Sequence, residues 1–234
     1  MIVSIHQPAY LPWLGYLHRI AVSDLYIVLD HVQFEKNSFI NRNKVRTKQG
    51  WCWLTVPVET KGRFGNLPIR EVGIARNIKW ADKHWQTICQ NYGKSVFFDD
   101  HADFLEHIYH QDWAELSPFL QKMTNYLLMS FGIDTQILYS SDLNVPGSKE
   151  ELVLNLCRKV GATTYLSGPL GRDYLDVETF SAQGIKVVFD EYEHPIYRQV
   201  DQAFEPYMAS LDLLCNHGPR SREIMMANQP EIQA

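Results

Sequence analysis

Short hydrophobic runs recur along the chain, and each is bounded by polar residues or by glycine. The runs are rich in Val, Ile, Leu and Tyr and are too short for helices, so they predict β-strands. The expected strands cover residues 2–6, 25–30, 135–139, 163–166 and 185–190. Helix-like segments separate several of them, and this alternation favours parallel strand pairing with right-handed crossovers.

Three segments between these strands have the features of crossover helices. Residues 13–22 are long enough for about three helical turns. Residues 148–161 start with a Ser-x-x-Glu capping box at Ser148, and residues 172–184 end on a glycine. These elements predict a three-layer, Rossmann-like α/β sandwich with a mostly parallel sheet, folded as a single domain over residues 1–234.

Residues 35–134 interrupt this alternation with a helical and β-rich segment. Extended stretches are expected at residues 51–59 and 67–74, and the helices that follow are expected at residues 80–91, 102–110 and 112–131. The segment is either an insertion on the sheet or an elaborated crossover, and periodicity does not separate the two. A further short helix is expected near the C-terminus, in the stretch ASLDLLCNHG.

Composition and charge narrow the class of partner. Hydrophobic residues make up 45% and charged residues 21% of the chain, as in ordinary globular proteins. The net charge of −5 does not favour nucleic acid as a partner. No apolar run approaches the roughly 20 residues that span a bilayer, and the first residues carry no basic signal region, so we expect a cytoplasmic protein without membrane insertion.

Several common chemistries lack their sequence signatures. The chain has no GxSxG, GxxxxGK[ST] or GxGxxG motif. The nine histidines form no zinc-binding pattern, so no metal site is predicted. The four cysteines are far apart and form no CxxC pair, which favours reduced thiols.

Polar residues instead gather where predicted strands end, and in an open parallel sheet ligands bind beyond the carboxyl ends of the strands. His6 and Gln7 follow the first strand, Asp30 ends the second, and Ser167 and Gly168 follow the fourth. A helix opening after Ser167 would direct free backbone N–H groups at an anion. A polar loop at residues 33–46 and the segment HPIYRQ at residues 194–199 add further candidates.

Each candidate also has a structural interpretation. His6 could be a core histidine, the loop Asn41-Arg42-Asn43 could order itself through Asx turns, and the glycines after the fourth strand could serve turn geometry alone. For Tyr10 and Trp13 we favour packing, although Tyr10 is retained as a candidate contact. HPIYRQ is either a binding loop or a rigid proline turn.

The stretch IHQPAYLPWLGYLHRI, with VQFEKNSFINRNKV, WLTVPV, YLSGPLGRDYLD and HPIYRQ further on, resembles the WbqC-like protein family. The resemblance spans essentially the whole chain. It implies a role in O-antigen, lipopolysaccharide or other surface polysaccharide biosynthesis, for which glycine transfer to the sugar has been suggested.

The N-terminal region also resembles nucleotidyltransferases of the HIGH-type superfamily and pantothenate synthetases. PWLGY stands where those proteins have H-x-G-H, with Trp13 and Tyr16 in place of the two histidines. LSGPLGR, at residues 166–172, stands near the place of their second phosphate-binding signature. This likeness implies a related nucleotide-binding fold rather than retained nucleotidyl transfer.

These resemblances imply a transferase or amide-forming ligase that joins an amino acid or other small acyl group to an amino sugar. In this hypothesis His6 is a general base or phosphate donor, Asp30 orients an amine or Mg²⁺, and Lys36 binds an anion. The substrate-binding candidates are Gln7, Tyr10, Gln33, Asn41, Arg42, Asn43, Arg46, Ser167, Gly168, Tyr174, His194 and Tyr197.

The expected partner of this enzyme is a small-molecule sugar or nucleotide sugar, with ATP and Mg²⁺ as candidate cofactors. The alternatives are a non-catalytic module that binds a sugar nucleotide, and a structural scaffold. The acceptor sugar, the acyl donor and a homo-oligomeric state are left open by the sequence.

Overall fold

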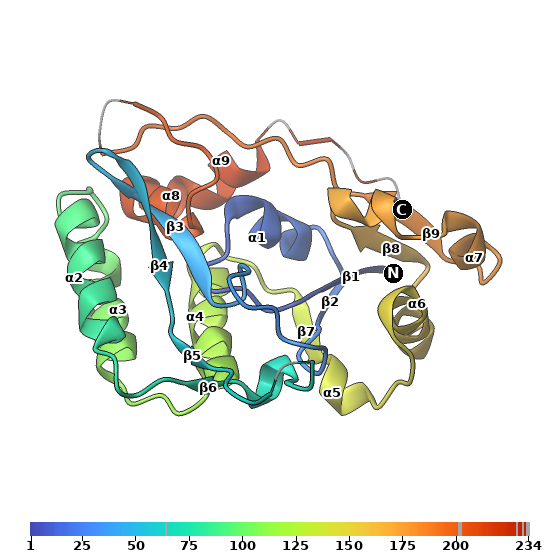
Figure 1. Cartoon of the computed structure of the whole chain (residues 1–234). Coiled ribbons are helices and arrows are strands. Elements are labelled where there is room, and N and C mark those ends of the chain that lie inside the picture. Colours follow the sequence, from blue (N-terminus) through green and yellow to red (C-terminus); the bar gives the residue numbers. More distant parts are fainter. Residues whose placement is uncertain (64, 201–202, 228, 231, 233–234) are drawn as a thin grey trace.

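A central parallel sheet organises the protein (Figure 1). The computed structural model describes every residue except 64, 201–202, 228, 231 and 233–234. The strands are β1 (Ile2–His6), β2 (Leu25–Val28), β7 (Gln136–Tyr139), β8 (Thr164–Ser167) and β9 (Lys186–Phe189). Their order is β7-β2-β1-β8-β9, and all four neighbouring pairs are parallel. The expectation of an α/β fold with a mostly parallel sheet is confirmed.

Helices cover both faces of this sheet. On one face, Val3 and Ile5 of β1 pack with residues of α6 (Lys149–Val160) and α7 (Val177–Ser181). The other face packs against a second apolar cluster that includes α1 and α4. Side chains alternate along a strand, so His6 points to the same face as Ser4, toward α1.

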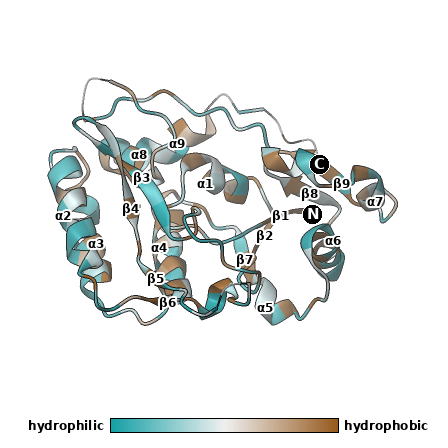
Figure 2. Ribbon diagram, in the orientation of Figure 1, coloured by the Kyte–Doolittle hydropathy of each residue, from teal (hydrophilic) through white to brown (hydrophobic). Residues whose placement is uncertain are grey.

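The helices of that second face come from the N-terminal, middle and C-terminal parts of the chain. They are α1 (Leu14–Ala21), α4 (Leu116–Ser130), α8 (Ser210–His217) and α9 (Ser221–Met226). Figure 2 shows hydrophobic residues on the strands and hydrophilic residues along the outer sides of α2, α3 and α6. This distribution is the one expected for amphipathic helices around a buried sheet.

Residues between β2 and β7 connect two strands that are neighbours in the sheet. They form a hairpin of β3 (Arg42–Thr47) and β4 (Gly50–Thr55), and a small pair of β5 (Val58–Glu59) and β6 (Gly73–Ile74). A 3₁₀ helix, η1 (Ile69–Glu71), and the helices α2 (Trp80–Tyr92), α3 (Asp99–His110) and α4 follow. The single-domain assignment, and the choice between an insertion and an elaborated crossover for this segment, stay predictions.

Two helix predictions differ from the structure in detail. Residues 172–184 contain a 3₁₀ helix, η2 (Pro169–Asp173), and then the short helix α7, because the Asp176 side chain accepts the Glu178 N–H and starts a new helix. Ser148 occupies the N-cap position of α6 without a side-chain capping bond. A four-residue helix, α5 (Ser140–Leu143), follows β7 and was not predicted.

Among the described residues, no helix is both long enough and apolar enough to cross a membrane.

Candidate functional site

The switch point of the sheet lies between β1 and β8, where the order of the strands reverses. Ser4 of β1 is paired with Leu166 of β8, so His6 and Gly168 lie beside each other at the carboxyl edge. Candidate residues that follow the first and fourth strands thus lie at the same edge of the sheet, an adjacency that the sequence leaves open. These residues define what we call the sheet-edge site.

Arg19 of α1 brings a buried positive charge to the sheet-edge site. Its Nε donates to Oδ2 of Asp190, which directly follows β9, across 3.3 Å. The two terminal guanidinium nitrogens each lie 3.1 Å from the position that a Cβ on Gly168 would take. Glycine at this position therefore lets the guanidinium lie directly against the backbone.

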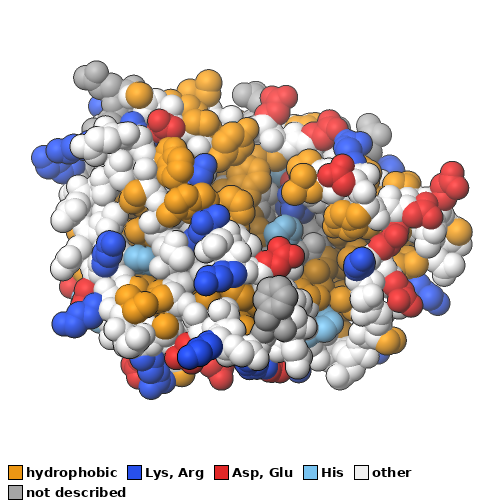
Figure 3. Space-filling model, viewed as in Figure 1, with side chains coloured by type: hydrophobic (Ala, Val, Ile, Leu, Met, Phe, Trp, Pro, Cys, Tyr) orange, Lys and Arg blue, Asp and Glu red, His pale blue; other side chains and the backbone are white. Residues whose placement is uncertain are grey.

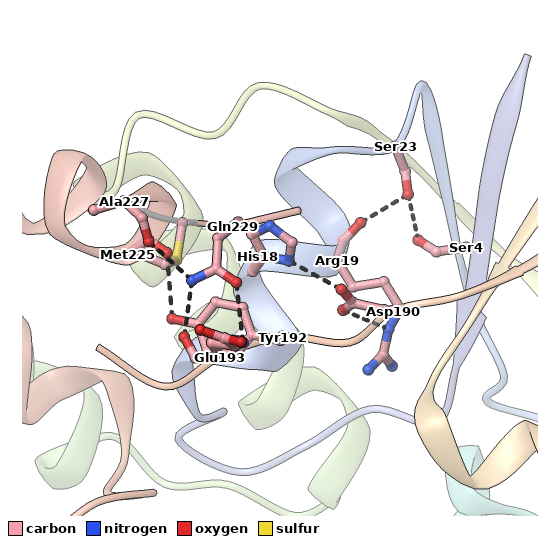
Figure 4. Close-up of polar contacts among 10 residues, drawn as sticks. All are labelled: Ser4, His18, Arg19, Ser23, Asp190, Tyr192, Glu193, Met225, Ala227 and Gln229. Carbon is pink, nitrogen blue, oxygen red and sulfur yellow. Dashed lines mark hydrogen bonds and ion pairs between the residues drawn. The ribbon is translucent and has the colours of Figure 1, made fainter. Parts of the chain in front are cut away.

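The terminal nitrogens of Arg19 have no hydrogen-bond partner among the residues that the structure describes. Figure 4 shows them pointing away from Asp190, with the only dashed line of the guanidinium at Nε. A guanidinium presents its donors in a fixed fork that matches phosphate or carboxylate oxygens. The sheet-edge site can therefore bind an anion through two donors whose orientation is already set.

Neighbouring contacts hold Arg19 in place (Figure 4). The Ser23 hydroxyl lies 2.7 Å from the Arg19 carbonyl oxygen and 2.9 Å from Oγ of Ser4, and so ties α1 to β1. Nδ1 of His18 lies 3.4 Å from Oδ1 of Asp190, an ion-pair distance without hydrogen-bond geometry. Asp190 is itself fixed, because its N–H donates to the Ser167 carbonyl across 2.8 Å.

His6 keeps part of its surface open to solvent, while the imidazole ring packs against neighbouring protein atoms, including the Tyr16 ring. Burial and the positive charge of Arg19 lower the pKa of His6 from 6.5 to about 4, so the imidazole is neutral near pH 7. Nδ1 lies 2.9 Å from the Gln7 carbonyl oxygen, which can only accept, so Nδ1 carries the proton. Nε2 is therefore the nitrogen whose lone pair can accept a hydrogen bond.

A hollow opens on this side of the molecule. Figure 3 shows it near the centre of the face, with histidine, basic, acidic and hydrophobic side chains in and around it. Tyr16 packs edge-on against His6, with ring centroids 5.3 Å apart. Tyr174 is 56% exposed. Burial raises the pKa of its phenol, and the positive charge of nearby Arg19 partly opposes this increase.

The predicted helix N-terminus after Ser167 is not formed. The segment is a five-residue 3₁₀ helix that begins with Pro169, and proline has no N–H to offer. Ser167 is buried, and its Oγ stands 2.1 Å from where a Cβ on Gly171 would lie. The donors at this edge thus come from the side chain of Arg19 and not from a helix end.

Asp30 occupies a structural position at the end of β2. Its carboxylate accepts hydrogen bonds from the Ser140 hydroxyl, the Ser141 N–H and the Ser141 hydroxyl at 3.0, 2.9 and 2.6 Å. It therefore anchors the start of α5. The two carboxylates near the carboxyl edge, Asp30 and Asp190, are both engaged, and no described group of three or more His, Cys, Asp or Glu could hold a metal ion.

The polar loop at residues 41–46 turns out to be largely β3. Asn41 and Asn43 are buried, and their side-chain amides donate to the carbonyl oxygens of Val56 and Leu11 at 2.9 and 2.6 Å. Arg46 is also buried and donates to the carbonyl oxygens of Thr47, Gly50 and Ala203. Its guanidinium is thus occupied by backbone, and Arg42 lies over the Trp53 ring instead of at the sheet edge.

The remaining candidates are dispersed. Tyr10 is fully buried, with its hydroxyl 2.9 Å from Nδ1 of His84, so it offers no surface to a substrate. Gln33 bridges the backbone of Phe34 and Leu67, and Lys36 is exposed, without a hydrogen bond or ion pair to described residues.

The candidates of the HPIYRQ segment pack among aromatic side chains. His194 stacks on Tyr197, with ring centroids 6.1 Å apart. The Tyr197 hydroxyl donates to Asp212 across 2.8 Å, and both of these side chains are buried. Tyr197 therefore belongs to a buried network in this structure.

A depression of about 1030 Å³ lies elsewhere, around β5 and β6. Its lining includes Glu59, Arg63, Glu71, Arg76 and Glu115, and none of the sheet-edge residues. Arg63 and Glu71 already pair there, with Nη2 of Arg63 2.6 Å from Oε2 of Glu71. Its position away from the switch point makes the sheet edge the stronger candidate.

Sequence reasoning missed Arg19, His18 and Asp190. A signal was present, since Arg19 is the only Asp, Glu, Lys or Arg between residues 6 and 23. Asp190 also ends a predicted strand, as Asp30 does. The contact itself joins residues 171 positions apart, which no local pattern reveals.

Comparisons with known proteins identify relatives along nearly the whole chain. The model of the WbqC-like protein family matches residues 7–224. A curated Mycobacterium tuberculosis (strain ATCC 25618 / H37Rv) protein, named "Uncharacterized protein Rv1507c", is 36% identical over 225 residues, which cover 95% of this chain and 96% of the relative. No solved structure matches the chain.

Proposed function

The chain belongs to the WbqC-like protein family, and from this premise we propose that it is a cytoplasmic enzyme of surface polysaccharide biosynthesis. It transfers glycine or another small acyl group to an amino sugar that carries a phosphate, as in a nucleotide sugar. The observation that supports this proposal most directly is the Arg19 fork, which is free beside Gly168 at the switch point.

Arg19 would bind the anionic group of the substrate. Asp190 holds the guanidinium through Nε, so the terminal nitrogens are oriented before the substrate arrives. Donors that are fixed in advance bind a charge without the cost of ordering a flexible side chain. The neutral Nε2 of His6 lies on the same side of the sheet and would accept a hydrogen bond from the substrate amine.

In the transfer step, the sugar amine would attack the carbonyl carbon of an activated acyl donor. The new C–N bond forms, the bond to the leaving group breaks, and Nε2 of His6 accepts the proton that the amine releases. A bound phosphate would offset the charge of Arg19, which lowers the pKa of His6 in the free protein. Substrate binding would thus make His6 a stronger base.

ATP and Mg²⁺ fit this site unequally. The Arg19 fork suits a phosphate, but Mg²⁺ sites generally use one or two free carboxylates together with substrate phosphates. Asp190 is paired with Arg19, and Asp30 with two serines. The described residues therefore do not fit a protein-held Mg²⁺, and no step is assigned to that ion.

The test is turnover with defined substrates. Purified protein would be incubated with ATP, Mg²⁺, a panel of amino acids and UDP-linked amino sugars, and both pyrophosphate release and the mass of the sugar nucleotide would be measured. We expect a mass increase for one amino acid, lost in Arg19→Gln and His6→Asn. An unmodified sugar nucleotide in every combination, including acyl-thioester donors, would overturn the transferase proposal.

One observation favours a second function, that of a sugar-nucleotide binding module without catalysis. With a pKa of about 4, the His6 of the free protein is a weak base near pH 7. A module would bind a UDP-linked amino sugar in an Arg19-dependent manner and would not change its mass. Calorimetry with the same panel distinguishes the two functions.

A further inference from the structure

The outer face of the β3–β4 hairpin carries alternating cationic and aromatic side chains. Lys44 of β3 is paired directly with Trp53 of β4. Arg42 lies two residues before Lys44 and Trp51 two residues before Trp53, so both are on the same face. Cζ of Arg42 lies 4.3 Å from the Trp53 ring centroid. Nζ of Lys44 lies 4.5 Å from the Trp51 centroid and 5.6 Å from that of Trp53. We call these four residues the cation–aromatic ladder.

The ladder is accessible from solvent. Trp51 is 43% exposed, and Phe39, whose ring centroid lies 5.9 Å from that of Trp53, is 53% exposed. Large apolar side chains that are left this open usually mark a binding surface when they cluster. In Figure 3, hydrophobic and basic side chains lie beside one another on the face that contains the hollow.

Among the described residues, no carboxylate forms an ion pair with the cations of the ladder. Neither Arg42 nor Lys44 forms an ion pair with any residue in the described part of the chain, although the whole chain has a net charge of −5. Oε1 of Glu205 lies 3.6 Å from the position that a Cβ on Gly50 would take, at the turn end of the hairpin next to Trp51. Exposed cation–π contacts contribute only about 0.5–1 kcal/mol each, so both charges can still attract an anion.

Backbone and aromatic contacts link the ladder to the sheet-edge site. The Ala209 N–H donates to the Lys44 carbonyl across 2.9 Å, and Ala209 also bridges to Trp13. The Trp13 ring lies 5.7 Å from Tyr192, which lies 4.8 Å from His18, next to Arg19. The contacts thus lead from the hairpin to the site along one side of the molecule.

We propose that the cation–aromatic ladder binds an acidic oligosaccharide. Aromatic rings pack well against the C–H faces of pyranose rings, and Arg42 and Lys44 would pair with carboxylates or phosphates on the sugars. The net negative charge of the chain and the small number of cations disfavour nucleic acid. The proposal concerns binding alone and holds whether or not the sheet-edge site is catalytic.

The test compares an acidic with a neutral probe on the full chain. Calorimetry would measure the affinity for a hyaluronan hexasaccharide, which carries carboxylates, and for maltohexaose, which does not. We expect the acidic probe to bind at least tenfold more tightly. Its affinity should fall at least tenfold in Lys44→Gln and in Trp51→Ala.

A matched control is available elsewhere in the chain. Nζ of Lys122 lies 5.8 Å from the Trp113 ring centroid, so Lys122→Gln removes a similar lysine from a similar ring. This variant should keep wild-type affinity, and thermal unfolding would verify that all three variants are folded. Arg19→Gln should also keep the affinity for the hexasaccharide, which separates this proposal from the proposed function.

Several results would overturn the proposal. One is equal affinity for the two sugars, and another is no binding of either sugar. A third is an equal loss of affinity for the acidic hexasaccharide in Lys122→Gln and Lys44→Gln. Tighter ladder-dependent binding of an oligothymidylate, or of vesicles that contain phosphatidylserine, would assign the surface to nucleic acid or to lipid instead. If Lys44→Gln unfolds, Arg42→Lys and Arg42→Gln provide the same comparison at the other end of the ladder.

Discussion

Replacement of Arg19 by lysine separates the charge of the sheet-edge site from its geometry. In the structure, one nitrogen of Arg19 is used by Asp190, and the other two have no partner among the described residues. A lysine ammonium can keep the pair with the buried Asp190, but it cannot also present a two-pronged fork. Arg19→Lys should therefore fold and bind anions more weakly, whereas Arg19→Gln should lose both the charge and the fork.

The expected loss follows from the number of donors. A hydrogen bond to a charged group contributes about 1.5–3 kcal/mol, so loss of one such donor should weaken sulfate binding by roughly 10- to 150-fold in Arg19→Lys. Arg19→Gln should weaken it further. Arg172 offers a matched control, because it is an exposed arginine near the same edge and is already paired with Glu191. Arg172→Gln should leave sulfate affinity within twofold of wild type.

The His6 resonance provides a second readout by NMR. Because Arg19 contributes to lowering the pKa of His6, Arg19→Gln should raise that pKa, although not to 6.5, since burial is the larger cause. Sulfate bound to the wild-type protein should raise it in the same direction. By linkage, sulfate should then bind more tightly as the pH falls through the pKa of His6.

Sulfate suits this titration because its own charge does not change over the pH range, and His6→Asn would assign the resonance. The reasoning is refuted if saturating sulfate leaves the His6 pKa unchanged, or if both Arg19 variants bind sulfate as the wild type does. Loss of folding in Arg19→Lys, judged by chemical-shift dispersion, would instead show that the fork is needed for the fold.

Three further predictions concern single residues. Gly168→Ala should weaken sulfate binding about tenfold, because its Cβ would stand 3.1 Å from the terminal nitrogens of Arg19. Calorimetry would measure the sulfate affinity, and urea unfolding should show little change in stability. Asp30→Ala should lower the free energy of unfolding by about 2–4 kcal/mol and leave sulfate affinity unchanged, because the Asp30 carboxylate accepts hydrogen bonds from Ser140 and Ser141. Weaker sulfate binding in the folded variant would contradict this. Burial raises the pKa of Asp212 from 3.8 to about 6. The wild-type protein should therefore lose up to about 3 kcal/mol of stability relative to Asp212→Asn as the pH rises from 4 to 7. Parallel pH profiles of urea unfolding for the two proteins would disprove this.

The central sheet was predictable because its signal is local. Hydrophobic runs bounded by polar residues gave the position of each strand to within about two residues, and the alternation with helices indicated parallel pairing. The order of the strands has no such local signal. The adjacency of the first and fourth strands, which brings His6 and Gly168 to the same edge, is therefore seen only in the structure.

The polar residues of β3 show where such reasoning fails. Asn41 and Asn43 were interpreted as loop residues because they are polar, yet both are buried, and their side-chain amides donate to backbone carbonyls. The alternation of these asparagines with the more exposed Arg42 is a strand pattern in which amides occupy the inner positions. Hydrophobicity alone cannot identify an inner position when hydrogen bonds, and not apolar contacts, satisfy it.

Arg19 and Asp190 form a pair whose burial is hard to explain by stability alone. Their side chains are 8% and 3% exposed. Desolvation of both charges offsets most of their attraction, and apolar residues of similar volume often stabilise a fold as well or better. A purely structural pair would be expected to use all of its donors, whereas this arginine leaves its terminal nitrogens open over a glycine at the switch point. The cost of burying the pair is therefore better explained by the ligand that those two nitrogens can bind than by the stability of the sheet that surrounds them.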